Sequence, residues 1–207
     1  LYGLFNNPFV KAYHGIQWFL FKKGMLAHSH LELGGFIKSS KDFEHPNIQL
    51  HFFPSLVINH GLESPDKHAF QFHACPNRPT SRGWVKLRSS DPNDMPLIQF
   101  NYLETEEDRQ QMRECVKISR NIFSQKAIQE FIGKEIRPGH EIQNDDELDE
   151  VIRNTSETAY HPSCTNKMGV DNISVVDPQT KVYGIANLRV VDSSIMPDIV
   201  SGNINAS

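Results

Sequence analysis

Two stretches near the end of the chain carry polar side chains suited to acid–base chemistry, each among small and turn-forming residues. His161 lies between Tyr160 and Pro162, and Asn203 follows Ser201-Gly202 further along. A histidine titrates near neutral pH and can accept a proton, and an asparagine amide can donate a hydrogen bond to the same oxygen. We therefore interpret His161 and Asn203 as a candidate catalytic pair built from two loops. Residue type alone favours ordinary surface turns for both, so the interpretation depends on the rest of the chain.

The other histidines favour structural roles. His28 and His30 form a His-x-His pair that would face one side of a strand, a spacing that can bind zinc. No cysteine or carboxylate set stands at matching spacing, so a surface pair is the preferred interpretation and we predict no metal site. His51 and His73 lie inside alternating runs with aromatic neighbours, which is typical of packed strand residues.

Composition and missing motifs exclude several function classes. A net charge of −4 argues against nucleic acid as the main partner. No run reaches the ~18 apolar residues of a membrane-spanning helix. The dinucleotide fingerprint, the P-loop and the serine-hydrolase elbow do not occur in the sequence. The widely spaced Cys75, Cys115 and Cys164 predict free thiols, with Cys115 in the core.

Hydrophobic periodicity predicts an α+β fold. Apolar residues at helical spacing predict helices over 9–23 and 105–125, the second with Thr105 and Asp108 as a capping arrangement, and a third that begins at an Asn144 cap. Alternating runs predict half-buried strands of a mainly antiparallel sheet, at 35–38, 48–53, 69–74, 84–88 and 98–100. Beyond Thr158 we expect short buried strands at 175–178 and 188–192. The fold would be an antiparallel sheet flanked by helices, followed by a tail too polar to close a domain.

Several short motifs follow one another over nearly the whole chain. They are Gly34–Ile37, Pro46–Gln49, Arg78–Ser81, Tyr160–Gly169, Val176–Thr180, Asn187–Pro197 and Ser201–Ala206. As an ordered set they resemble the glucose–methanol–choline (GMC) family of flavin-dependent alcohol oxidoreductases, and most of all its choline-oxidising members. The order makes the resemblance more specific than any one motif.

The resemblance implies a division into two domains. Residues 1–170 would form a substrate-binding domain. Residues 171–207 would be a tail that returns to an FAD-binding domain not included in the chain. Because half of the cofactor site would then lie upstream, the 207 residues alone are expected to be inactive, and the native N-terminus is expected to lie outside a chain that starts with Leu1.

The resemblance also implies roles for individual residues. His161 matches the family's active-site histidine and Asn203 its partner. Asn205 and Ala206 match the stretch whose backbone lies along the flavin, and Asp192 belongs with these cofactor-binding residues. His51 would face the alcohol.

The activity implied is oxidation of choline to betaine aldehyde by hydride transfer to FAD, as in glycine betaine synthesis. In a eukaryote the resemblance implies the mitochondrial inner membrane. Peripheral membrane association, the electron acceptor and the oligomeric state stay open.

Two other functions stay open as well. The same fold would serve a different primary alcohol, or the sheet with His28, His30 and His51 would be a non-enzymatic metal- or partner-binding module. Two residues depart from the family pattern. Asn166 stands where many relatives have Cys, with little effect expected on chemistry, and Ser207 stands where Pro is usual.

Overall fold

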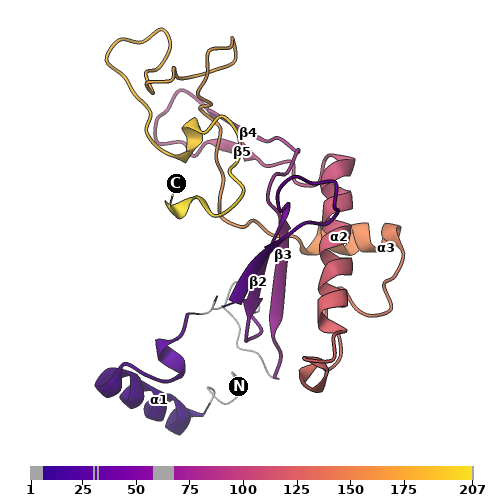
Figure 1. Cartoon of the computed structure of the whole chain (residues 1–207). Helices are drawn as coiled ribbons and strands as arrows, with labels where there is room; N and C mark the ends of the chain where they lie inside the picture. The colour runs from indigo at the N-terminus through magenta and orange to yellow at the C-terminus, as the bar shows by residue number, and fades with distance from the viewer. Residues whose placement is uncertain (1–6, 30, 32, 58–67, 207) are drawn as a thin grey trace. The chain divides into compact units, whose positions relative to one another are not determined.

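The computed structural model describes residues 7–29, 31, 33–57 and 68–206. Its helices are α1 (Pro8–Phe21), α2 (Glu106–Phe123) and α3 (Asp145–Thr155), and its strands are β1 (Leu33–Ile37), β2 (Ile48–Phe53), β3 (Gln71–Pro76), β4 (Trp84–Lys86) and β5 (Leu97–Gln99). Strands β1, β2 and β3 form one sheet in that order, and β4 pairs with β5 in a second (Figure 1). The predicted α+β class with antiparallel pairing is confirmed.

The described residues fall into two compact units. Unit 1 comprises those within 1–37 and 48–74, and unit 2 comprises those within 38–47 and 75–207. The domain boundary expected near residue 170 is a different kind of division, and it stays a prediction.

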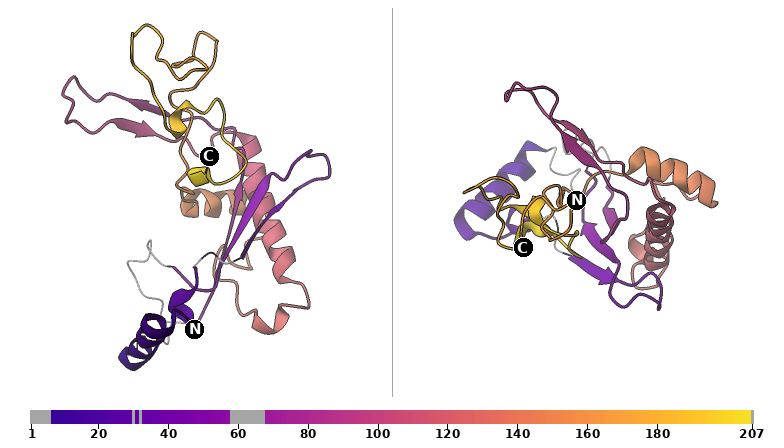
Figure 2. Two further views of the ribbon diagram at one scale, coloured as in Figure 1. Left: turned by 60° about the vertical axis from the view of Figure 1, so that its left-hand side comes forward. Right: turned by 90° about the horizontal axis from the view of Figure 1, so that it is seen from above.

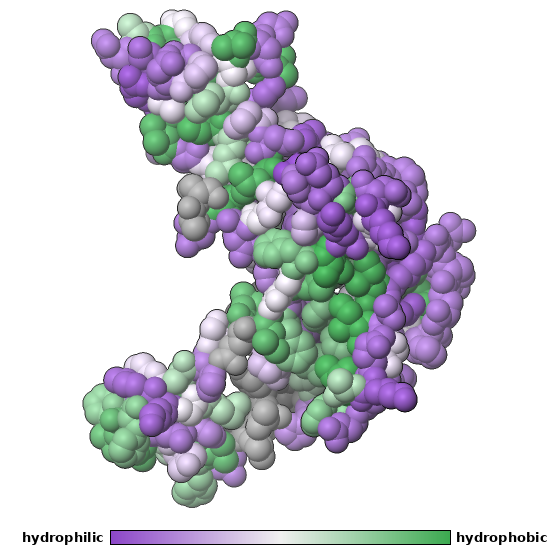
Figure 3. Space-filling model, viewed as in Figure 1, coloured by the Kyte–Doolittle hydropathy of each residue, from purple (hydrophilic) through white to green (hydrophobic). Residues whose placement is uncertain are grey.

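Helix α1 in unit 1 is apolar but not buried. It starts where the Asn7 side chain accepts a hydrogen bond from the Phe9 N–H at 2.9 Å, and it ends at the left-handed Lys22. None of its residues is buried, and its surface carries apolar side chains (Figure 3). The large exposed ones are Phe9, Tyr13, Ile16, Trp18, Phe19, Leu20 and Phe21. Within the described part of the chain, no helix is long and apolar enough to cross a membrane.

In the three-stranded sheet, the backbones of β1 and β2 come close together at His51. Strands β1 and β2 pair antiparallel with Gly34 opposite His51. A Cβ at Gly34 would lie 2.8 Å from the Leu50 carbonyl oxygen, so this register requires glycine there. Ile48 and Leu50 bury the other face of β2, which the alternating sequence predicts.

Helices α2 and α3 in unit 2 begin at the predicted caps. The Thr105 Oγ1 accepts from the Asp108 N–H at 3.3 Å, and the Asn144 Oδ1 accepts from the Glu147 N–H at 2.8 Å. Cys115 of α2 is 2% exposed, as predicted, and burial raises the pKa of its thiol to about 12. It is therefore a protonated core residue.

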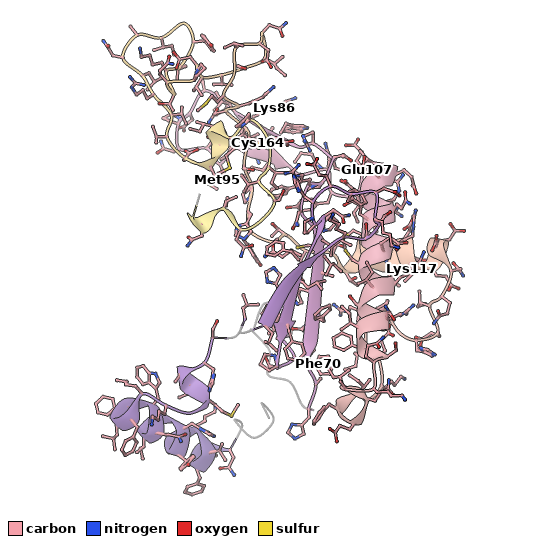
Figure 4. The ribbon with its side chains drawn as sticks, viewed as in Figure 1. Phe70, Lys86, Met95, Glu107, Lys117 and Cys164 are labelled. Carbon is pink, nitrogen blue, oxygen red and sulfur yellow. The ribbon has the colours of Figure 1, made fainter. Side chains whose placement is uncertain are left out.

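Ion pairs join the polar sides of α2 and α3. Arg113 donates to both carboxylate oxygens of Asp149, at 2.8 and 2.7 Å, and to Glu106 at 2.5 Å. Only 11% of the Arg113 side chain is exposed. Hydrogen bonds from its guanidinium to Glu106 and Asp149 raise its pKa. Lys117, labelled on α2 in Figure 4, bridges to Asp145 at 3.0 Å.

Two expectations about buried strands are wrong. The β4–β5 hairpin is exposed rather than half-buried, with Val85 50% and Met95 74% exposed, because no other helix or strand among the described residues packs extensively against it. In the tail, residues 175–178 and 188–192 form isolated bridges and loops rather than strands (Figure 2). Val176 is fully buried, whereas Val191 is 76% exposed.

Replacing Arg113 by alanine should loosen the α2–α3 pair. The change leaves Asp149, whose side chain is 20% exposed, without its counter-charge, and we expect a loss of about 2 kcal/mol in local opening free energy. Amide hydrogen exchange of α3 in the whole protein measures this loss. The control Arg153→Ala removes an exposed arginine of α3 and should cost about 0.5 kcal/mol. Equal effects of the two variants would contradict the role given to Arg113.

Candidate functional site

The loop that carries His161 has a constrained backbone. Tyr160 and Cys164 both adopt left-handed conformations, with φ of 62° and 72°. Such conformations cost about 1–3 kcal/mol each for residues other than glycine and gather at functional sites. The Tyr160 N–H is held by Thr158 Oγ1 at 3.0 Å, and the His161 side chain between these points is half-buried. The backbone on either side of His161 is therefore held in conformations that residues other than glycine rarely adopt.

The His161 loop is hydrogen-bonded to the segment just after Asp192. Three backbone bonds run between them: Cys164 N–H to Ser193 O at 3.2 Å, Asn166 N–H to Ser194 O at 2.9 Å, and Met168 N–H to Ile195 O at 2.9 Å. The Asn166 amide also donates to Ser194 Oγ at 2.9 Å. Figure 4 labels Cys164 in this region. The structure thus joins two of the motifs that the sequence places far apart, and Asn166 takes part in the joint.

Asp192 has a structural task in this arrangement. Its Oδ1 accepts the Ser194 N–H at 2.8 Å and begins the short helical turn Ser193–Ile195. Hydrogen bonds from Ser194 lower the pKa of Asp192. The carboxylate shapes the turn that binds the His161 loop, and its predicted contact with a cofactor stays a prediction.

The segment before Asn203 is held by two arginines from one loop. Arg78 Nε donates to Ser201 Oγ at 2.5 Å, and Arg82 Nη2 donates to Asp198 Oδ1 at 3.1 Å. Asn203 follows on an exposed position. Residues 78–82, which we call the arginine loop, therefore hold residues 198–201, the segment just before Asn203.

A buried carboxylate on α2 fixes the arginine loop. Asp108 is 3% exposed and accepts hydrogen bonds from the Thr80 N–H at 2.7 Å and the Ser81 N–H at 2.9 Å. Ser81 Oγ accepts in return from the Glu104 and Thr105 N–H groups, at 3.0 and 3.2 Å. Burial acts to raise the pKa of Asp108, but the hydrogen bonds from Ser81 and Thr80 outweigh it, so the net pKa lies below its ordinary value.

The predicted site residues divide between the two units. His161, Asp192, Asn203 and Asn205 belong to unit 2, as does Ala206, which lies in the short helical turn Ile204–Ala206. His51 belongs to unit 1, on β2. Within the described residues, the side chains of His161 and Asn203 make no hydrogen bond to each other.

The metal-binding alternative gains no support. His28 is exposed in unit 1, and His30 lies outside the described residues. No group of three or more potential ligands gathers in the part of the chain that the structure describes.

Sequence reasoning missed the residues that organise this site. Arg78 is part of a motif that carries the family resemblance, but the motif assigns it no task. Asp108 reads from sequence as a capping partner of Thr105, whereas its carboxylate binds the loop at Thr80 and Ser81. An acid in the first helical turn, with no basic residue three or four positions further on, is too common a pattern to reveal that contact.

Comparison with known proteins identifies the family. The protein-family model described as GMC oxidoreductase matches residues 79–207. This range includes His161, Asn203 and all of the arginine loop except Arg78. This chain belongs to the GMC oxidoreductase family. The resemblance inferred from its motifs is confirmed.

Curated relatives of this GMC chain are choline dehydrogenases by name. "Choline dehydrogenase, mitochondrial" of Homo sapiens is 53% identical over 203 residues, which cover 97% of this chain and 34% of the human protein. "Oxygen-dependent choline dehydrogenase" of Pectobacterium carotovorum is 46% identical and covers 98% of this chain and 36% of that protein. The chain therefore spans about a third of the length of these relatives.

Solved structures share the fold. Pyridoxine 4-oxidase from Mesorbium loti aligns with a TM-score of 0.77 and 28% identity, over 84% of this chain and 35% of that one. A formate oxidase from Aspergillus oryzae aligns with a TM-score of 0.83 over 96% of this chain and 39% of that one, at 24% identity. These likenesses support the α+β architecture of this GMC chain.

Asp108→Asn should release the arginine loop. The variant keeps the size of the side chain but replaces one accepting oxygen by a donor, so the Thr80 or Ser81 N–H loses its partner. We expect the opening free energy of residues 80–82 to fall by about 1–3 kcal/mol, measured by hydrogen exchange. Asp146→Asn, at an exposed position of α3, is the control and should change it by less than about 0.5 kcal/mol.

The same variant should remove a dependence on pH. Because the pKa of Asp108 is lower in the folded protein, its carboxylate stabilises the fold fully above the unfolded value of about 4, and that contribution is lost as the pH falls through the folded value. In Asp108→Asn the opening free energy of residues 80–82 should not show this acid-dependent loss. A loss of the same size in both proteins would contradict the assignment.

Proposed function

We propose that this chain is the substrate-binding part of an FAD-dependent choline dehydrogenase that oxidises choline to betaine aldehyde. Membership of the GMC oxidoreductase family and the names of the relatives at 53% and 46% identity support this. The structural observation that best supports it is the joint between the His161 loop and residues 193–195, because it brings two of the family's motifs together.

The residues of this chain suit alcohol oxidation. His161 is half-buried and unpaired among the described residues, so its imidazole would accept the hydroxyl proton of the alcohol or stabilise the alkoxide. The Asn203 amide would donate a hydrogen bond to the same oxygen and fix its position. His51, on the sheet of unit 1, would face the substrate. Bound FAD would accept the hydride.

The chain offers donors that fit a flavin. Asn203 and Asn205 are exposed, and the described structure gives their side chains no hydrogen bonds. In our proposal Asn205, the backbone at Ala206 and the region of Asp192 lie against the cofactor, whose remaining contacts come from an FAD-binding domain.

The proposed domain organisation explains the surface of the tail. Residues 1–170 would bind substrate, and residues 171–207 would return to the FAD-binding domain. Around and after the proposed boundary, large apolar side chains are uncovered: Val170, Ile173, Tyr183, Ile185, Leu188 and Val191. A surface of this kind is typical of a contact with another domain.

We further propose a mitochondrial location and peripheral attachment to a membrane. The human and mouse relatives are named as mitochondrial. Helix α1 exposes Trp18, Phe19 and Phe21 and is followed by Lys22 and Lys23, a pattern that suits an interfacial helix. The first acidic residue of the chain is Glu32, so this region is basic in a protein of net charge −4.

His161→Ala should nearly abolish flavin reduction by choline while FAD stays bound. Loss of a general base costs about 10²–10⁴-fold in rate. Stopped-flow absorbance of the whole protein measures reduction and bound flavin together. His140→Ala, at an exposed position of a turn, is the control and should react at the wild-type rate.

The outcomes of that assay separate the alternatives. If choline reduces the flavin of His161→Ala at a rate within a few-fold of wild type, the catalytic role proposed for His161 is wrong. If choline fails to reduce the wild-type flavin but another primary alcohol succeeds, the substrate assignment is wrong and the alcohol-oxidising site stands. A stoichiometric metal with no flavin requirement would favour the metal-binding module.

Phe19→Glu should weaken binding of the whole protein to vesicles of anionic phospholipid. Removing a buried phenylalanine from the lipid interface lowers affinity about tenfold or more. Co-sedimentation with vesicles is the measurement, and Leu87→Glu, on an exposed residue of unit 2, is the control. If the two variants bind equally, or if the wild type stays in the supernatant, membrane attachment through α1 is wrong.

A further inference from the structure

The segment that leads to Asn203 has few anchors. Within residues 197–205, the local hydrogen bonds are Ile199 N–H to Asp198 Oδ1 at 2.8 Å and Gly202 N–H to Val200 O at 2.9 Å. Among the described residues, the hydrogen bonds that tie this segment to the rest of the chain come from Arg78 and Arg82. Hydrogen bonding between this segment and the rest of the chain therefore depends on two arginine side chains.

Arg82 is itself prepared for this contact. The Arg82 guanidinium also donates to the Pro79 carbonyl at 2.7 Å and the Ser81 carbonyl at 3.1 Å, so it is fixed against its own loop. The Arg82 carbonyl accepts from Asn101 Nδ2 at 3.0 Å. The loop backbone between the arginines is bound by Asp108. A planar guanidinium held in this way loses little freedom when it binds its target.

Both arginines are exposed, and the two contacts differ in hydrogen-bond geometry. The Arg82–Asp198 pair is open to water, with 63% and 68% of the side chains exposed, so it adds little to overall stability. The Arg78–Ser201 bond is a short, charge-assisted bond two residues before Asn203. Of the two arginines, Arg78 therefore restrains the backbone closer to Asn203.

We propose that Arg78 and Arg82 are positioning residues that hold Asn203 in place for the reacting oxygen. The inference rests on the proposed function, in which Asn203 donates to the alcohol oxygen. Since a donor contributes to rate only when it is fixed where charge develops, loosening residues 198–201 should lower the rate of hydride transfer more than it weakens substrate binding.

A double-mutant cycle tests the proposal in the whole flavin-loaded protein. Arg78→Ala and Ser201→Ala should each slow the limiting rate of flavin reduction by choline about tenfold, with a smaller change in the choline concentration at half-saturation. The double variant should be no slower than Arg78→Ala, because the two side chains share one bond. Arg78→Lys should recover part of the rate, since an ammonium can still donate to Ser201. Arg88→Ala is the matched control, because Arg88 is exposed in the β4–β5 hairpin and donates to the Met95 carbonyl.

Multiplicative effects in the double variant, or a wild-type rate in Arg78→Ala, would overturn the proposal. A second readout keeps it separate from the choline assignment: amide exchange of residues 199–206 should quicken in Arg78→Ala and not in Arg88→Ala. If no alcohol reduces the wild-type flavin, the proposed function fails, and the exchange comparison still decides whether Arg78 holds the segment. Unchanged exchange in Arg78→Ala would overturn the positioning role.

Discussion

The buried carboxylate of Asp108 is the interaction on which the arrangement of the site depends. It accepts two backbone N–H groups from the loop at Thr80 and Ser81, and this fixes the backbone that carries Arg78 and Arg82. A carboxylate that is 3% exposed is tolerated only because these donors replace water. Through the arginines, the N-terminus of α2 reaches the segment that ends in Asn203. The first turn of α2, rather than the rest of the helix, therefore positions the arginine loop and, through it, residues 198–201.

His161 is held by a second, separate set of contacts. Its loop bonds to residues 193–195, whose turn is capped by Asp192, and the left-handed Tyr160 and Cys164 lie on either side of the histidine. One part of the tail thus supports the histidine, and the next part presents the asparagine. Functional groups on loops held by rigid elements are a common solution, because loops can carry residues that a core could not.

Local signals in the sequence predicted local structure. The caps at Thr105 and Asn144, the alternation along β2 and the burial of Cys115 all follow from neighbours within a few residues. The structure of the tail was predicted less well. The valines at 175–176 and 190–191 predict buried strands, but the bridges in this region are isolated and form no strand. The arginine contacts could not be predicted from pattern, because Arg78 and Ser201 lie 123 positions apart. The roles proposed for His161 and Asn203 come from the order of the family's motifs rather than from periodicity.

The central claim is that this chain brings one histidine and one asparagine to the same alcohol oxygen. A crystal structure of the whole protein with a non-reactive choline analogue bound would test it most directly. We predict that a His161 ring nitrogen and the Asn203 amide nitrogen both lie about 2.6–3.2 Å from the hydroxyl oxygen of the analogue. An analogue hydroxyl bound away from His161, or an Asn203 side chain directed elsewhere, would contradict the account.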